Sequence, residues 1–177
     1  MKLSGRVAAR RPRTFLPRPT AGVVLLEPFK LAPGTDAHAL SRMTPCTRTE
    51  AAEHLGSGEA LHALIDGGAV RELPASCTPE QFRGLFADVA IVSRNGVAVA
   101  SHGNGIVELV APAGGTTRVS TALYEVLRRS TTGTVPMPTV IDRVAPKWGG
   151  TDSIIAEVIT RLRALLASGA VVLVRVG

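Results

Sequence analysis

The sequence predicts an α+β fold built from two small units in tandem. A helix–glycine–strand pattern occurs twice, β-prone runs separated by turn residues fill residues 89–119, and helical patterns follow as far as residue 168. With 177 residues, of which 45% are hydrophobic, the chain can bury one core or two small cores in contact. Only two cysteines are present, which excludes a disulfide scaffold.

The repeated pattern reads LHALIDGGAVREL at residues 61–73 and LRALLASGAVVLV at residues 162–174. Six positions are identical at a constant offset of 101 residues, and one of them pairs Gly68 with Gly169. A glycine just past a helix adopts the left-handed conformation at little cost, so each copy is expected to end a helix and begin a strand. Two interpretations remain open: a true structural repeat, and two unrelated joints of a common kind.

Antiparallel strands are expected within residues 89–119. Asn95-Gly96 lies between the β-prone runs Val89–Arg94 and Val97–Ser101, which predicts a tight hairpin because both turn positions tolerate positive φ. Further turns predict strands at Ile106–Val110 and Thr116–Val119. The sequence therefore predicts a small antiparallel meander.

Three helices are expected after the meander. Ser120 is the expected N-cap of the first, and Pro138 suits the first turn of the second. Thr151 or Asp152 is expected to cap the third, whose apolar positions recur at helical spacing up to Ser168.

On the exposed face of the third helix, Glu157 and Arg161 have the i,i+4 spacing of an ion pair. A closing strand is expected at Val171–Val176. The meander and the three helices together have the order of a winged helix with a three-helix helix-turn-helix.

The first half has the same character. A strand is expected at Val23–Leu26 and a short helix at Ala37–Met43, while Thr47 and Glu50 form a capping box for a helix through Leu55. A turn at residues 56–58, a helix at Glu59–Asp66 and a strand at Ala69–Leu73 follow with helix-turn-helix spacing. The expected divisions are a disordered basic arm (1–19), an N-terminal helix-turn-helix-like unit (20–78), a connecting helix (79–88) and a C-terminal winged-helix-like unit (89–177).

The net charge of +6 belongs to the arm. Residues 1–19 contain six basic residues and no acidic one, and the remaining 158 residues contain 14 basic and 14 acidic residues. A DNA-binding domain usually carries its excess charge on the folded body. Neutrality of the body therefore favours partners other than nucleic acid.

A targeting role for the arm is weakly supported. Arg10-Arg11 followed by Phe15-Leu16 has a faint likeness to a twin-arginine signal, but the apolar stretch after it, Ala21–Leu26, ends at Glu27. A secretory segment needs about 7–15 apolar residues and a membrane span about 20. We expect a cytoplasmic protein that does not enter the membrane.

Motifs for catalysis and metal binding are missing from the sequence. His38, Cys46, His54 and His62 lie eight residues apart, which is not the close spacing of metal ligands. Ser101-His102 has no acidic partner nearby, and the glycine-rich turns lack the residues of a phosphate loop. We therefore expect no catalytic residue, no metal and no cofactor.

Trp148 follows Lys147 in a loop between the last two helices. It is a candidate contact residue, although the high average burial of tryptophan favours a role as a lid over the core.

Residues 106–176, which run IVELVAPAGGTTRVSTALYEVLRRSTTG and continue to SIIAEVITRLRALLASGAVVLV, resemble the PqqD-like family. These domains are RiPP recognition elements that bind the leader peptides of ribosomally made natural products. Thr132-Gly133 stands where the family often has Asp-Gly, and Pro136-Met137-Pro138 and the Trp148 loop are also atypical. The resemblance implies that an extended peptide adds to an open sheet edge beside a helix.

The resemblance also implies which residues bind the peptide. The edge would be formed by Thr117, Arg118 and Val119, and the wall of the groove by the helix from Ile154, with Val158 and Arg161.

Three functions remain open. The first is a non-catalytic adaptor that presents a peptide or partner protein to a modifying enzyme. The second is a DNA-binding regulator that uses Arg161 and Arg163 together with an arm able to enter a minor groove; the arm residues concerned are Arg10, Arg11 and Arg13. The third is a subunit or detached regulatory domain of a larger enzyme. The oligomeric state is left open.

Overall fold

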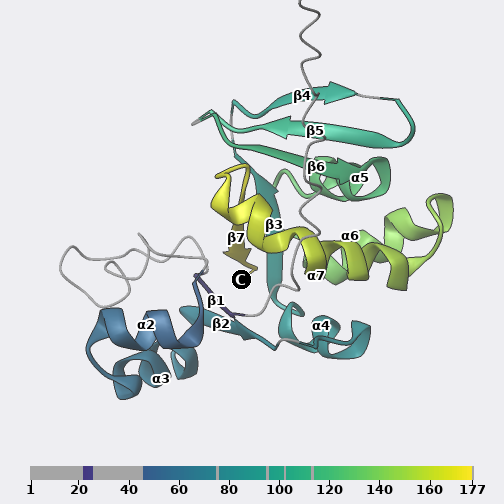
Figure 1. Cartoon of the computed structure of the whole chain (residues 1–177). Coiled ribbons are helices and arrows are strands. Elements are labelled where there is room, and N and C mark those ends of the chain that lie inside the picture. Colours follow the sequence, from purple (N-terminus) through teal and green to yellow (C-terminus); the bar gives the residue numbers. More distant parts are fainter. Residues whose placement is uncertain are drawn as a thin grey trace, which may run out of the picture.

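The computed structural model describes residues 22–25, 46–74, 76–94, 96–101, 103–112 and 114–176. It confirms the α+β class, because helices alternate with small antiparallel sheets (Figure 1). The elements in chain order are β1 (Gly22–Leu25), α2 (Arg48–Leu55), α3 (Gly58–Asp66), β2 (Val70–Leu73), α4 (Pro79–Leu85), β3 (Val89–Ser93), β4 (Ala98–Ser101), β5 (Ile106–Val110), β6 (Thr116–Ser120), α5 (Thr121–Arg129), α6 (Met137–Val144), the 3-10 turn η1 (Ala145–Lys147), α7 (Thr151–Ala167) and β7 (Val171–Arg175).

Helices α2 and α3 pack on each other around a small core of their own. The expected capping box is present at α2, where the Thr47 hydroxyl accepts from the Glu50 amide and the Glu50 carboxylate accepts from the Thr47 amide. Strand β2 then pairs with β1, with Leu73 opposite Gly22. The helix expected at Ala37–Met43 lies outside the described residues. The buried members of this core are Cys46, Ala51, Leu61, Ala69 and Val70.

Helix α4 belongs to the larger, C-terminal core. Its Phe82 and Phe86 are fully buried, with ring centroids 4.6 Å apart. Arg83 donates two hydrogen bonds to Asp142 of α6 and lowers the pKa of that carboxyl below its usual value. The segment expected to connect the two halves is therefore packed against the second.

The pairing of strand β3 differs from the one expected from the sequence. The hairpin expected across Asn95-Gly96 is wrong, because β3 pairs with β7, with Ile91 opposite Leu173. Asn95 lies outside the described residues, but the Val97 amide donates to the Arg94 carbonyl, so the chain does turn there. The turn leads into a different sheet. The reason is that Val89, Ala90 and Ile91 are completely buried, and β7 offers an equally apolar partner.

The rest of the expected meander is confirmed as a three-stranded sheet in the order β4-β5-β6. Figure 1 shows its strands running across the direction of β3 and β7. Val107, Leu109 and Val119 project from one face into the core, where they meet helix α5 with its buried Leu123 and Val126. Ser120 is the N-cap of α5 as expected, since its hydroxyl accepts from the Leu123 amide.

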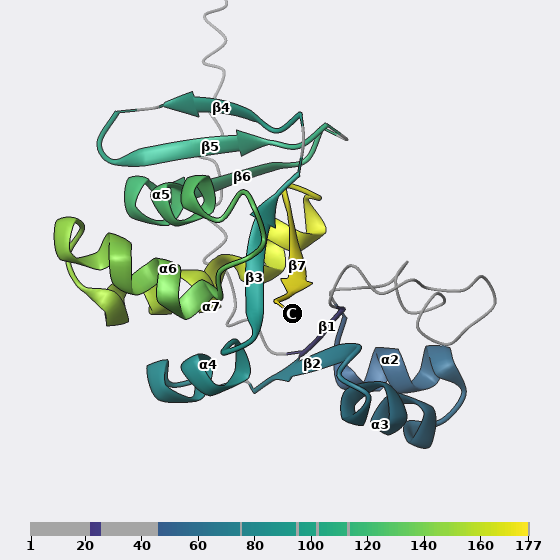
Figure 2. The same ribbon diagram turned by 180° about the vertical axis from the view of Figure 1, so that it is seen from behind.

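Helix α7 is the longest helix among the described residues and carries six buried apolar side chains. Its expected cap is wrong: the N-cap is Gly150, with a φ of 103° and no side-chain cap. Thr151 instead donates to Asp142 at 3.3 Å. Figure 2 shows α5 and α6 on one side of β3 and α7 passing behind it, with all three helices away from α2 and α3.

No helix among the described residues is long and apolar enough to cross a membrane.

Candidate functional site: the margin between β6 and α7

Strand β6 is an edge strand with outward-facing backbone groups. The Gly115 carbonyl accepts from the Ala111 amide at 2.7 Å, so the odd-numbered residues along β6 bond to β5. Backbone direction alternates along a strand, and Thr116 and Arg118 therefore direct their N–H and C=O groups away from the sheet. Both residues are exposed, and in the part of the chain that the structure describes β6 pairs with β5 alone.

Helix α7 lies directly alongside this edge. At one end, a Cβ added to Gly115 would lie only 2.7 Å from the Ser168 carbonyl oxygen, so glycine permits the close approach. Further along, the Thr117 hydroxyl donates to the Ala164 carbonyl at 3.3 Å. The strand and the helix are thus already in contact at this end.

At the other end of β6, Glu157 of α7 binds Ser120. Its carboxylate accepts from the Ser120 amide at 2.7 Å and from the Ser120 hydroxyl. This contact replaces the ion pair expected between Glu157 and Arg161, for which the described residues give no hydrogen bond. One outward amide of β6 is therefore already bonded, and Thr116 and Arg118 supply the remaining outward amides.

The residues predicted for the peptide site divide into two groups. Thr117 and Val119 point inward and are buried, as are Ile154 and Val158 of α7, which are at most 2% exposed. We use 'margin' for the surface between the outer edge of β6 and helix α7. These four side chains build the core beneath the margin and do not form an open groove wall. Only the backbone of this stretch of β6 faces outward, at Arg118.

Arg118 and Arg161 are the predicted site residues that reach the surface. The Arg118 side chain is 65% exposed, and its guanidinium donates to Glu108 of β5 at 2.8 Å. Arg161 is half-buried on α7, and within the described ranges it has no ion pair. The charge of Arg118 is therefore paired with Glu108, and Arg161 supplies the positive charge on the α7 side.

A hollow of about 260 Å³ opens where β6 meets the first turn of α7. Trp148 stands at its rim, with 43% of its surface exposed, so the lid role favoured by the sequence is only partly fulfilled. The residues that line it are Gly105, Ser120, Thr121, Ala122, Trp148, Ser153, Ile154 and Glu157. A partly exposed tryptophan beside a polar floor is typical of an anchor at an interface.

Comparisons of the chain with protein-family models, with curated proteins and with solved structures gave no match. What the margin can do is therefore judged from its own chemistry.

The margin offers hydrogen-bonding groups from Ser120 and Glu157 and an apolar contact at Trp148. Among the described residues no three His, Cys, Asp or Glu side chains come together as metal ligands. Burial raises the pKa of both described thiols, Cys46 and Cys77, so they stay protonated at neutral pH and are poor nucleophiles. His38 and His102 lie outside the described residues.

The alternative DNA-binding residues do not form one surface in the described chain. Arg161 and Arg163 are two positions apart on α7, and residues at that spacing do not face each other. The charge of Arg163 instead acts on Glu50 of α2, where it adds to the effect of the Thr47 hydrogen bonds that lower the pKa of Glu50. Arg10, Arg11 and Arg13 lie outside the described residues.

The sequence does not predict the contact between Ser120 and Glu157, whose hydrogen bonds join β6 to α7. The sequence pattern places Glu157 in an exposed ion pair and indicates only a helix cap for Ser120. The missing information is the distance between β6 and α7, which is a tertiary property. The presence of Gly115 before β6 is the one local signal of a close approach.

Proposed function

We propose that the protein is a non-catalytic adaptor that binds an extended peptide and presents it to a modifying enzyme, with a ribosomal precursor (leader) peptide as the proposed class of ligand. The peptide pairs with the outer edge of β6 by strand addition, so that its backbone bonds to Thr116 and Arg118. A bulky side chain near one end of the peptide occupies the hollow beside Trp148.

The observation that carries this proposal is the outward backbone of β6 next to that hollow. Main-chain hydrogen bonds supply affinity in strand addition, and a side-chain pocket supplies selectivity. Thr116 and Arg118 provide the first on an exposed edge, and the 260 Å³ hollow provides the second. Arg161 favours a peptide with an acidic residue near its centre, since the charge of Arg118 is paired with Glu108.

The proposal includes a winged-helix-like, PqqD-like arrangement of the C-terminal unit and residence in the cytoplasm. The order β4-β5-β6-α5-α6-α7 supports the first. The free thiols of Cys46 and Cys77 support the second, because reducing compartments keep thiols unpaired.

Calorimetry with peptides encoded next to the gene tests the proposal. The informative variant is Arg118→Pro, which removes the outward amide of an edge residue without removing a bond to β5. Arg118→Ala is the matched control, because it deletes the same side chain and keeps the amide. Arg118→Pro is expected to weaken binding at least about tenfold more than Arg118→Ala does.

A thermal melt of each variant reports whether the fold is kept. Equal binding by the two variants, or no binding of any such peptide at high micromolar concentration, would contradict strand addition at β6.

A further inference from the structure

Strand β4 forms the opposite edge of the three-stranded sheet and is exposed along its whole length. All four of its residues are exposed, and Val99 retains 48% of its accessible surface. Figures 1 and 2 both show β4 as the strand of this sheet farthest from α5, α6 and α7. Edge strands are commonly protected by charged side chains, proline or a bulge, and the sequence AVAS has none of these.

Strand β4 also has outward-facing backbone groups. Odd-numbered residues of β5 bond to β6, so its even-numbered residues bond to β4. The register places Ala98 opposite Val110 and Ala100 opposite Glu108, which makes these the bonded pairs. Val99 and Ser101 therefore present their N–H and C=O groups to the outside.

A hollow of about 310 Å³ lies on the inner side of β4, between this strand and α5. Val99 and Leu109 form its apolar wall, and Tyr124 and Arg128 of α5 form the facing wall. A residue added opposite Val99 would project to the same face as Val99, and hence into this hollow. The complete lining is Ser93, Arg94, Gly96, Val97, Val99, Leu109, Tyr124, Arg128 and Thr131.

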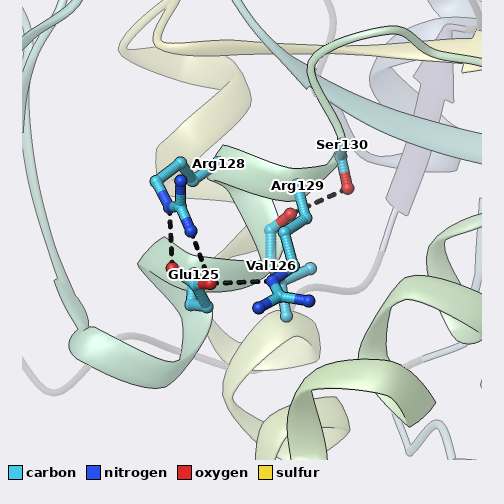
Figure 3. Close-up of polar contacts among 5 residues, drawn as sticks. All are labelled: Glu125, Val126, Arg128, Arg129 and Ser130. Carbon is cyan, nitrogen blue, oxygen red and sulfur yellow. Dashed lines mark hydrogen bonds and ion pairs between the residues drawn. The ribbon is translucent and has the colours of Figure 1, made fainter.

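The lining contains two arginines and no acidic residue. Of the two, Arg128 has a side chain that is 58% exposed and a guanidinium that Glu125 holds in place (Figure 3). Glu125 accepts two hydrogen bonds of 2.8 Å from Arg128 and one of 2.7 Å from Arg129. One carboxylate thus serves two guanidinium groups, and a net positive charge remains beside the hollow.

We propose that β4 docks an extended acidic segment of a partner protein, which pairs with Val99 and Ser101 and places a Glu or Asp side chain in the hollow beside Arg128. This site is separate from the margin between β6 and α7. It gives the sheet a second docking edge, so that a peptide and a partner protein can be held at opposite edges of one sheet.

The test is a selection of linear 12-residue peptides displayed on phage against the full 177-residue chain. Enriched peptides are expected to alternate β-prone residues with at least one Glu or Asp. Their synthetic forms are then measured for binding to Val99→Pro, which removes an outward amide of β4, and to Arg128→Glu. Each change is expected to weaken binding by about tenfold or more.

Two control variants show whether binding depends on this hollow and on this edge of the sheet. Arg143→Glu makes the same charge change on an exposed arginine of α6 that does not line the hollow, and Arg118→Pro alters the other edge; both are expected to leave binding within about threefold. Ser101→Pro replaces Val99→Pro should the latter fail to give a cooperative melt.

Any of three results with displayed peptides would overturn the proposal: no peptide enriched, enriched peptides without acidic residues, or binding that Arg118→Pro weakens and Val99→Pro does not. The last would leave the proposed function at β6 intact. A dimer in analytical ultracentrifugation that Val99→Pro dissociates would assign β4 to a second copy of the chain, and would also overturn the proposal.

Discussion

The two helix–glycine–strand joints have the same local geometry in different surroundings. The C-cap residues Gly67 and Ser168 have φ values of −70° and −71°, and the glycines that follow them, Gly68 and Gly169, have 72° and 73°. The amide after each glycine donates to the carbonyl five residues earlier, at 3.0 Å from Ala69 and 3.2 Å from Ala170. The repeat seen in the sequence is therefore a real repeat of local structure.

The two joints differ in the strand with which the following strand pairs and in the number of residues that the preceding helix buries. Strand β2 pairs with β1, whereas β7 pairs with β3. Helix α3 buries one residue, Leu61, in the smaller core, whereas α7 buries six in the larger one. Short-range sequence thus determines how a helix turns into a strand, but the amount of apolar surface on the helix determines which core forms around it.

This difference also explains why both proposed binding sites lie in the C-terminal unit. Helix α7 lies beside a three-stranded sheet with two exposed edges, while in the described residues α3 lies beside a two-stranded sheet only. The N-terminal copy therefore lacks the surface on which both proposed sites are built, and changes in it are expected to leave peptide binding unaltered.

The largest expected effect comes from truncating the equivalent leucines of the two helices. Leu162→Ala is expected to lower the free energy of unfolding of the C-terminal unit by about 3 kcal/mol, because the side chain is completely buried. Leu61→Ala is expected to destabilise α2 and α3 instead. Urea unfolding followed by fluorescence of the single tryptophan, Trp148, reports the C-terminal unit, and far-UV circular dichroism reports the whole chain.

In that experiment Leu162→Ala moves the fluorescence transition and Leu61→Ala leaves it nearly in place. An equal shift of the fluorescence transition by both variants would mean that the two cores unfold as one, and the two joints would then belong to a single cooperative unit.

A smaller effect is expected from replacing the joint glycines. Gly68→Ala and Gly169→Ala each force an L-residue into the left-handed region, at a cost of about 1 kcal/mol. At Gly68 the new Cβ also lies 3.0 Å from the Arg175 guanidinium, which can move aside. Amide exchange is expected to rise in α3 for the first variant and in α7 for the second. A neutral Gly169→Ala would show that the joints are not equivalent.

Asp88 connects the strands that follow the two joints. Replacing it is expected to have the next-largest effect on stability. Its carboxylate accepts from Arg71 of β2 at 2.8 Å and lies 3.3 Å from Arg175 of β7. Asp88→Asn is expected to cost about 1 kcal/mol or less, since all three side chains are partly exposed. The fluorescence and circular dichroism transitions should separate further in this variant. Transitions that move together would indicate that other contacts couple the halves.

The smallest effect is the acid response of α5. Hydrogen bonds from Arg128 and Arg129 lower the pKa of Glu125 from 4.5 to about 2. A depressed carboxyl pKa stabilises the folded state above the unfolded pKa, and this contribution is lost as the pH falls from about 4.5 to about 2. Because the arginines are exposed, we expect less than about 1 kcal/mol. Glu125→Gln should remove this part of the pH dependence of fluorescence-detected stability. An unchanged acid profile in that variant would contradict the assignment.

Local signals in the sequence locate most helices and strands but not how they associate. The capping box of Thr47 and Glu50, the N-cap Ser120 and the strand β7 are predictable because each depends on neighbours within a few residues. The hairpin expected at Asn95-Gly96 is wrong, because a turn signal does not specify which strand β3 pairs with. That choice depends on burial beside β7, almost 80 residues away in the sequence.

The candidate site shows the same limit. The β6 edge, including Arg118, is expected only from the resemblance described in the sequence analysis. The same resemblance places Ile154 and Val158 in a groove wall, but both are buried because α7 approaches the sheet closely. The edge position of β4 is not predicted, because the hairpin expected at Asn95-Gly96 would pair this strand with β3, which instead pairs with β7.

The central claim is that an extended peptide completes the sheet at β6. Its most direct test is hydrogen exchange of the Thr116 and Arg118 amides, followed by NMR with and without a bound peptide. We expect both amides to exchange at least about tenfold more slowly in the complex, while the already bonded Ser120 amide changes little. A peptide that binds and leaves the exchange of Thr116 and Arg118 unchanged would contradict strand addition at this edge.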